Sequence, residues 1–187
     1  MVAINLIPVF IAYFVGAIPF GVLVARLRGV ELRDHGSGNI GATNAARVLG
    51  LGAGAVVLVL DALKGAVMVI IAIRMTGDPE LVALTGFAAI VGHCFSPFLG
   101  FTGGKGVATT LGVYVTLAPQ LALIGIAVFL LIAGRTKVVA LGSLSGMLAA
   151  AIASFLAYPE HRVMAVVTLV LLIYTHRTNL ATILTKS

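Results

Sequence analysis

Residues 36–47 form a polar, glycine-rich segment, GSGNIGATNAAR, whose residue types suit the binding of an anion. Three glycines within its first six residues permit positive φ and let the main chain approach a ligand closely. Consecutive N–H groups in such a turn can form an anion-binding concavity, and Arg47 adds a planar guanidinium that suits phosphate. The pattern is equally typical of a tight turn in which Thr43 or Asn44 caps the next helix, so both interpretations stay open.

A second polar segment, residues 92–109, reads GHCFSPFLGFTGGKGVAT and leads into an apolar stretch. If residues 103–106 open a helix, its N–H groups and the positive end of its dipole would face an anion, and Lys105 would add a full positive charge. The segment does not match a nucleotide-binding P-loop. Leu99 stands where that motif requires glycine, and Gly106 stands where it requires serine or threonine. We therefore exclude ATP binding.

Two histidines are candidates for proton transfer. His93 fits three roles, as a general base, a phosphate ligand or a residue that caps a helix. Residues 176–179 read HRTN, and the three-residue spacing of His176 and Asn179 would place both on one face of a helix. A basic residue at that point could equally be a cap that interacts with the helix dipole.

Asp61 and Lys64 lie inside an apolar stretch that is long enough to be a membrane helix. Ionisable residues are rare within membranes and suggest function by default. The two are three residues apart, so they share a helix face and can pair with each other. A structural ion pair that lines the polar site is favoured over direct chemistry.

The composition places these polar segments on a scaffold that faces lipid. Of the 187 residues, 60% are hydrophobic and 10% charged, with a mean hydropathy of +1.17, whereas soluble domains are about one quarter charged. The formal charge of +6 is too small and too scattered to follow a nucleic-acid backbone. Cys94 is the one cysteine, and the histidines and acidic residues show no ligand pattern, so neither a metal nor a cofactor is expected.

Hydropathy predicts an all-α integral membrane protein with about seven transmembrane helices. The predicted helices lie within residues 4–27, 45–73, 81–98, 107–117, 120–133, 138–156 and 162–174. The short fourth helix follows the second glycine-rich segment and is separated from the fifth at Pro119, because proline removes a donor and disfavours helix before it. No basic region precedes the first apolar run, which is therefore predicted to be a retained helix and not a signal peptide.

The basic residues predict the orientation, with the N-terminus outside and the C-terminus in the cytoplasm. The inward segments would hold Arg26, Arg28, Arg33, Arg47, Lys105, Arg135, Lys137, Arg177 and Lys186, against Arg74 and Arg162 outside. All three polar segments then lie on the cytoplasmic side. The whole chain, 1–187, is predicted to be one polytopic domain.

These segments together resemble the bacterial acyl-phosphate:glycerol-3-phosphate acyltransferases, the PlsY family. The resemblance rests on residues 36–47, 92–109 and 176–179 and on the stretch DALKG at 61–65. It implies transfer of a long acyl chain from acyl phosphate to the 1-hydroxyl of sn-glycerol 3-phosphate in the bacterial inner membrane, on its cytoplasmic side. The products would be 1-acylglycerol 3-phosphate (lysophosphatidic acid) and phosphate, in the first step of phospholipid synthesis. The chain departs from the family at Thr102, where a basic residue is frequent, and after Asn179, where another arginine is common.

The resemblance also assigns roles to residues. The catalytic residues would be Ser37, Asn39, Arg47, Lys105, His176 and Asn179. The substrate-binding residues would be Gly38, Gly41, Thr43, Asn44, Lys64, His93, Gly103 and Gly104. We expect Arg47, Lys105 and the N–H groups of Gly103 and Gly104 to hold phosphate and to stabilise charge that develops during transfer. The base would be His93, His176 or a phosphate oxygen of a bound substrate.

The expected partners are glycerol 3-phosphate, a long-chain acyl phosphate and membrane lipid. The main alternative is a membrane transporter for a small organic phosphate, whose broken helices would also point their N-termini at an anion. It is disfavoured because the polar motifs lie on one face, and because seven helices do not divide into equal halves. A purely structural membrane protein would not need three polar segments on one side.

Overall fold

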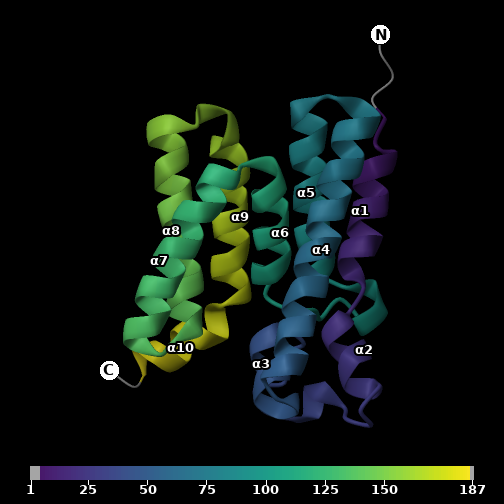
Figure 1. Cartoon of the computed structure of the whole chain (residues 1–187), viewed down its shortest axis with the longest axis vertical. Coiled ribbons are helices and arrows are strands. Elements are labelled where there is room, and N and C mark those ends of the chain that lie inside the picture. Colours follow the sequence, from purple (N-terminus) through teal and green to yellow (C-terminus); the bar gives the residue numbers. More distant parts are fainter. Residues whose placement is uncertain (1–4, 186–187) are drawn as a thin grey trace. The chain divides into compact units, whose positions relative to one another are not determined.

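The computed structural model describes residues 5–185, and every regular element in that range is a helix (Figure 1). The predicted all-α membrane architecture is confirmed. Ile4, where the first helix was predicted to begin, and Lys186, one of the predicted inward-facing cations, lie outside the described residues.

Within the described range, five segments are long and apolar enough to cross a bilayer. They are Ile7–Arg26, Leu51–Thr76, Pro79–Leu99, Pro119–Thr136 and Val139–Ala157. A sixth candidate is a pair of helices, Pro159–Thr175 and Arg177–Ile183, that are bent by 61°. The short fourth helix is confirmed as α6 (Val107–Leu117), whose 11 residues fall well short of the roughly 20 that a span needs. The predicted orientation stays a prediction.

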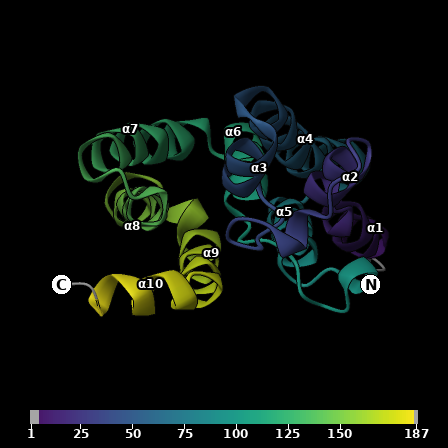
Figure 2. The same ribbon diagram turned by 90° about the horizontal axis from the view of Figure 1, so that it is seen from below.

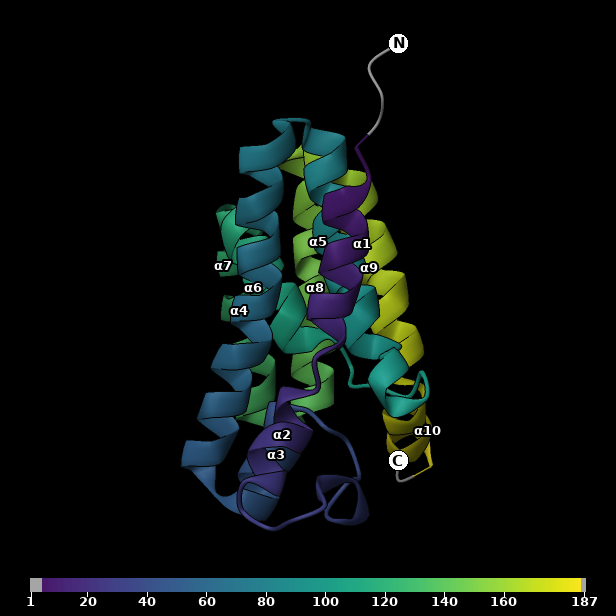
Figure 3. The same ribbon diagram turned by 90° about the vertical axis from the view of Figure 1, so that its right-hand side faces the viewer.

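The chain forms two compact units, one ending at Thr116 and the other beginning at Leu117, and each is described by itself. The first unit contains α1 (Ile7–Ala17), α2 (Phe20–Arg26), α3 (Ala42–Leu49), α4 (Leu51–Thr76), α5 (Pro79–Cys94) and α6. Helices α1, α4 and α5 pack against one another, and α3 packs against α4 (Figures 1 and 3). Helices α2 and α3 and the loop between them lie at one end of this unit (Figure 3).

Small residues allow these helices to approach closely. A Cβ atom at Gly16 of α1 would collide with the main chain of Ala89 in α5, and one at Gly112 of α6 would collide with the main chain of Ala62 in α4. Such contacts are typical of membrane helices, which associate through close backbone packing because lipid supplies no hydrophobic drive between them. The glycines therefore fix the spacing of the helices that carry the polar segments.

Two predicted helices are interrupted. The stretch 4–27 is not one helix: α1 ends at Ala17 and α2 begins at Phe20, because Pro19 has no N–H to donate to the preceding turn. The stretch 45–73 begins earlier than predicted, as α3, and breaks at Gly50. Gly50 has φ 91, a left-handed conformation that residues with a Cβ rarely adopt.

The second unit contains α7 (Pro119–Thr136), α8 (Val139–Ala157), α9 (Arg162–Thr175) and α10 (Arg177–Leu184). Helix α8 packs against both α7 and α9 (Figure 2). A Cβ at Gly146 of α8 would reach the main chain of Gly125 in α7, so this pair also approaches closely. Helix α7 begins at Pro119, one residue before the predicted start at Gln120.

Candidate active site

Asn44 holds the first glycine-rich segment in place. Its Oδ1 accepts the N–H of Ser37 at 2.8 Å, and its amide nitrogen donates to the carbonyls of His35 at 3.0 Å and Leu32 at 3.3 Å. The side chain is buried, and a Cβ at Gly36 (φ 63) would collide with it. The amide group of Asn44 therefore shapes the loop, and its predicted contact with substrate stays a prediction.

The same loop exposes polar side chains around the start of α3. Asn39 Oδ1 accepts the N–H of Gly41 at 2.9 Å, a short-range bond of the kind that Asn makes in turns. Gly41 is the residue at the N-cap, so the alternative that Thr43 or Asn44 caps this helix is wrong, because both lie inside α3. Ser37, Thr43 and Arg47 are exposed, while Gly38 and Asn39 are half-buried.

The second polar segment is tied to α1 and to the end of α5. The buried Ser96 hydroxyl donates to the Ala17 carbonyl at 2.7 Å. The N–H of Gly103 donates to the Cys94 carbonyl at 3.0 Å, and that of Gly104 donates to the His93 carbonyl at 3.0 Å. The expectation that these two N–H groups hold phosphate is therefore wrong, because both are already paired with main-chain oxygens.

Lys105 follows directly and is half-buried. Burial lowers the pKa of its ammonium group below the ordinary value for lysine. A second cation comes from the other loop, since Arg33 Nη2 donates to the Thr102 hydroxyl at 2.9 Å. This bond links the loop before α3 to the second glycine-rich segment, and it brings a guanidinium beside Thr102, where the sequence itself has no basic residue. No local pattern predicts this bond, because Arg33 precedes the motif and lies 69 residues from Thr102.

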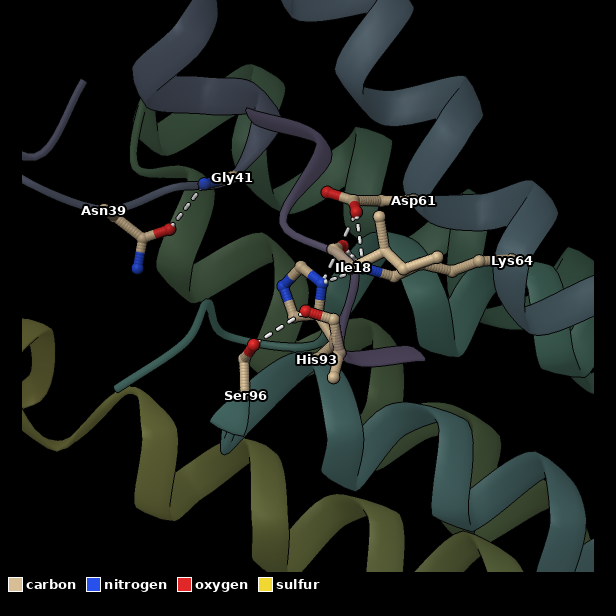
Figure 4. A network of polar contacts seen from close by, with 8 residues as sticks. Ile18, Asn39, Gly41, Asp61, Lys64, His93 and Ser96 are labelled. Atoms are coloured by element: carbon tan, nitrogen blue, oxygen red, sulfur yellow. Dashed lines mark hydrogen bonds and ion pairs between the residues drawn. The ribbon is translucent and has the colours of Figure 1, made fainter. Parts of the chain in front are cut away.

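A buried polar cluster lies where α1 and α5 end, beside the middle of α4 (Figure 4). Lys64 Nζ lies 2.7 Å from Asp61 Oδ1, which confirms the predicted ion pair. The ammonium also contacts His93 Nδ1 at 2.9 Å and donates to the Ile18 carbonyl at 2.9 Å. Asp61, Lys64 and His93 are each at most 5% exposed. The three side chains contact one another, and the substrate contact expected of Lys64 and His93 stays a prediction.

The cluster does not supply a metal site. Two of its members, Asp61 and His93, are of ligand type, with Asp61 Oδ1 3.5 Å from His93 Nδ1. Among residues 5–185, however, no three His, Cys, Asp or Glu side chains gather in a way that could hold a metal ion. We therefore assign no metal ligands.

In the second unit, His176 lies at the junction of α9 and α10. Its ring is buried, and Nδ1 lies 2.8 Å from the Leu172 carbonyl. A carbonyl oxygen can only accept, so Nδ1 carries the proton and Nε2 is the basic nitrogen of the neutral ring. The chain bends by 61° here, so residues 176–179 do not continue α9, and Asn179 lies in the first turn of α10.

Comparison with known proteins decides the family. Residues 6–186 match the family model described as glycerol-3-phosphate acyltransferase. The chain belongs to the glycerol-3-phosphate acyltransferase family. It is 45% identical to the glycerol-3-phosphate acyltransferase of Myxococcus xanthus over 176 residues, which cover 92% of each protein. It is 43% identical to that of Aquifex aeolicus over 180 residues, which cover 95% of this chain and 94% of the relative.

Two crystal structures of PlsY (YgiH), an integral membrane glycerol 3-phosphate acyltransferase, share the fold. The glycerol 3-phosphate form superposes with a TM-score of 0.91 at 42% identity and covers 96% of this chain and 91% of that one. The lysophosphatidic acid form gives a TM-score of 0.89 at 41% identity, with the same coverage. The predicted family is confirmed, and this acyltransferase family places the chain in phospholipid biosynthesis as a multi-pass membrane protein.

Proposed function

We propose that this acyltransferase moves a long acyl chain from acyl phosphate to the 1-hydroxyl of sn-glycerol 3-phosphate, at the cytoplasmic face of a bacterial inner membrane. The observation that carries the proposal is that Arg33, Arg47 and Lys105 belong to one helical unit, in which Arg33 bonds to Thr102 of the second glycine-rich segment. The relatives are named for glycerol 3-phosphate, and one solved relative is a lysophosphatidic acid form.

The loop chemistry suits substrates that carry phosphate. Guanidinium groups bind phosphate oxygens through paired N–H donors, and an ammonium group adds a compact charge. Arg47 and Lys105 would take these two roles. Ser37, Asn39 and Thr43 offer uncharged groups to orient the hydroxyls of the acceptor. The apolar helices beside the loops supply the surface that a long acyl chain requires.

In the proposed reaction, the 1-hydroxyl oxygen of the acceptor attacks the acyl carbonyl carbon. A new C–O ester bond forms, the bond between the acyl carbon and the phosphate oxygen breaks, and inorganic phosphate leaves with the bonding electrons. Negative charge develops on the carbonyl oxygen and on the leaving phosphate, where fixed cations lower the barrier most. The hydroxyl proton must pass to a base.

His93, His176 and a phosphate oxygen of the substrate are the candidates for that base. The bond from His176 Nδ1–H to the Leu172 carbonyl fixes the tautomer in which Nε2 can accept a proton. Asn179, in the next helix, is proposed to act with it on the acceptor. Both assignments rest on the resemblance of residues 176–179 to the family motif.

The donor is tested by giving purified protein in detergent glycerol 3-phosphate with either palmitoyl phosphate or palmitoyl-CoA. Lysophosphatidic acid is then quantified by mass spectrometry. Product from palmitoyl phosphate alone supports the proposal, and product from palmitoyl-CoA alone would contradict the proposed donor. Binding of glycerol 3-phosphate with no product from either donor would favour the transporter, because no gradient exists in detergent.

A further inference from the structure

The buried Lys64 ammonium group contacts three polar groups of the protein. An ammonium group has three donors and no acceptor. Its hydrogen-bond partners are the Ile18 carbonyl at 2.9 Å and His93 Nδ1 at 2.9 Å, and it forms an ion pair with Asp61 Oδ1 at 2.7 Å. Because the ammonium can only donate, His93 Nδ1 must accept. The proton of the neutral ring therefore sits on Nε2.

The charges of the cluster agree with this tautomer. Asp61 and Lys64 cancel each other, so a neutral His93 leaves the buried group with no net charge. A protonated His93 would place a second positive charge beside the Lys64 ammonium at a site where all three side chains are shielded from water. An uncompensated charge in such a place is strongly unfavourable.

His93 connects this cluster to the loop that carries Lys105. A Cβ atom at Gly104 would collide with His93 Nε2, so the ring lies directly against that glycine. The His93 carbonyl also accepts the N–H of Gly104 at 3.0 Å, and Lys105 is the next residue. Ile18 contributes the carbonyl at the break between α1 and α2. Figure 4 shows Ile18, Asp61, Lys64 and His93 gathered from the end of α1 and from α4 and α5. The contact of His93 with Gly104 brings this cluster within one residue of Lys105 in the sequence.

We propose that Asp61, Lys64 and His93 are positioning residues, which fix the main chain at Gly104 so that Lys105 is held where it meets phosphate. The inference rests on the proposed function in giving Lys105 that role. It also removes His93 from the candidates for the base, because its one basic nitrogen is covered by the Lys64 ammonium and the other carries a proton.

The tautomer is tested without any substrate. Nitrogen-15 NMR of protein labelled at histidine separates the two neutral tautomers and the imidazolium by their ring shifts, and the His93 signals are those lost in His93→Gln. We expect His93 to be neutral, with its proton on Nε2, at about pH 7. A proton on Nδ1, or a charged ring, would overturn the inference whatever the outcome of the activity assays.

The positioning role is tested by kinetics with a paired variant, Asp61→Asn with Lys64→Met, which removes both charges and leaves neither unpaired. Because a misplacement of about 1 Å can cost roughly 10²-fold, we expect kcat/KM to fall by about that factor. Thr85→Val is the matched control, since Thr85 is buried in α5 and its hydroxyl donates only to the Leu81 carbonyl of its own helix. It should stay within about twofold of wild type.

Coupling to Lys105 separates positioning from a general loss of structure. Combined with Lys105→Ala, the paired variant should lower kcat/KM little below the value of Lys105→Ala alone, because both changes remove the same contribution. Effects that multiply would overturn the inference. Each variant is first shown by size-exclusion chromatography and thermal melting to be folded. If wild type makes no lysophosphatidic acid, the proposed function fails, and the NMR test still stands.

Discussion

Replacing Gly104 by alanine tests how far the site depends on one close contact. The added Cβ would collide with the His93 imidazole, which Lys64 holds from its other side. Atoms in contact prefer a separation of about 3.5–4 Å, so the loop or the ring must move by about 1 Å or more. Gly104 does not have a positive φ, so the expected effect is steric and not a matter of backbone strain.

The magnitude follows from that displacement. Overpacking of this kind costs about 1–3 kcal/mol of stability, and a shift of about 1 Å in Lys105 would lower kcat/KM by roughly 10²-fold. The matched control is Gly52→Ala in the first turn of α4, where a Cβ meets nothing within 4 Å. Both variants are assayed for lysophosphatidic acid formation and for thermal midpoint in detergent. Activity of Gly104→Ala within threefold of wild type would refute the reasoning.

Four further predictions follow from individual contacts. Asn44→Ala should lower the free energy of unfolding by about 1–3 kcal/mol, because the buried main-chain groups that Asn44 bonds would be left unsatisfied. The thermal midpoint should fall and glycerol 3-phosphate should bind more weakly. Unchanged values would contradict the role of Asn44 in holding the loop. Burial lowers the pKa of Lys105, so activity should fall as the pH rises through that lowered pKa. Lys105→Arg should shift this fall to higher pH, because arginine keeps its charge. An identical pH profile for the two proteins would refute the role of the Lys105 charge. Arg33→Ala should raise KM for glycerol 3-phosphate by about tenfold, because a charged hydrogen bond is lost. Arg26→Ala breaks only an exposed ion pair and should change KM by less than about twofold. Equal effects of the two variants on KM would contradict a specific role for Arg33. If His176 is the base, His176→Ala should lower kcat by about 10²–10⁴-fold, and a loss below about tenfold would favour a phosphate oxygen of the substrate.

The sequence predicted well those features that depend on local composition. Apolar runs of about 20 residues identified the spans, because lipid requires them, and Pro119 placed the division between α6 and α7. The Asp61–Lys64 ion pair followed from a three-residue spacing inside an apolar helix, since two charges there must find partners. The break at Ile18–Pro19 was missed because hydropathy reads continuously across it.

The features that depend on contacts between distant residues could not be predicted in the same way. His93 joins Lys64 across 29 residues of sequence, and no local pattern specifies that pairing. The glycine-rich loops showed that N–H donors were abundant but not where they would bond. The N–H groups of Gly103 and Gly104 donate to carbonyls at the end of α5, and the Asn44 side chain accepts an N–H of the loop before α3.

We propose that the cationic loops catalyse acyl transfer from acyl phosphate to glycerol 3-phosphate. The most direct test follows phosphate release from palmitoyl phosphate by purified protein, with and without glycerol 3-phosphate, while lysophosphatidic acid is measured in the same samples. We predict phosphate release that depends on the acceptor, matches lysophosphatidic acid mole for mole, and falls by about 10²-fold or more in Lys105→Ala. Phosphate release that is the same without glycerol 3-phosphate, or no release at all, would contradict the claim.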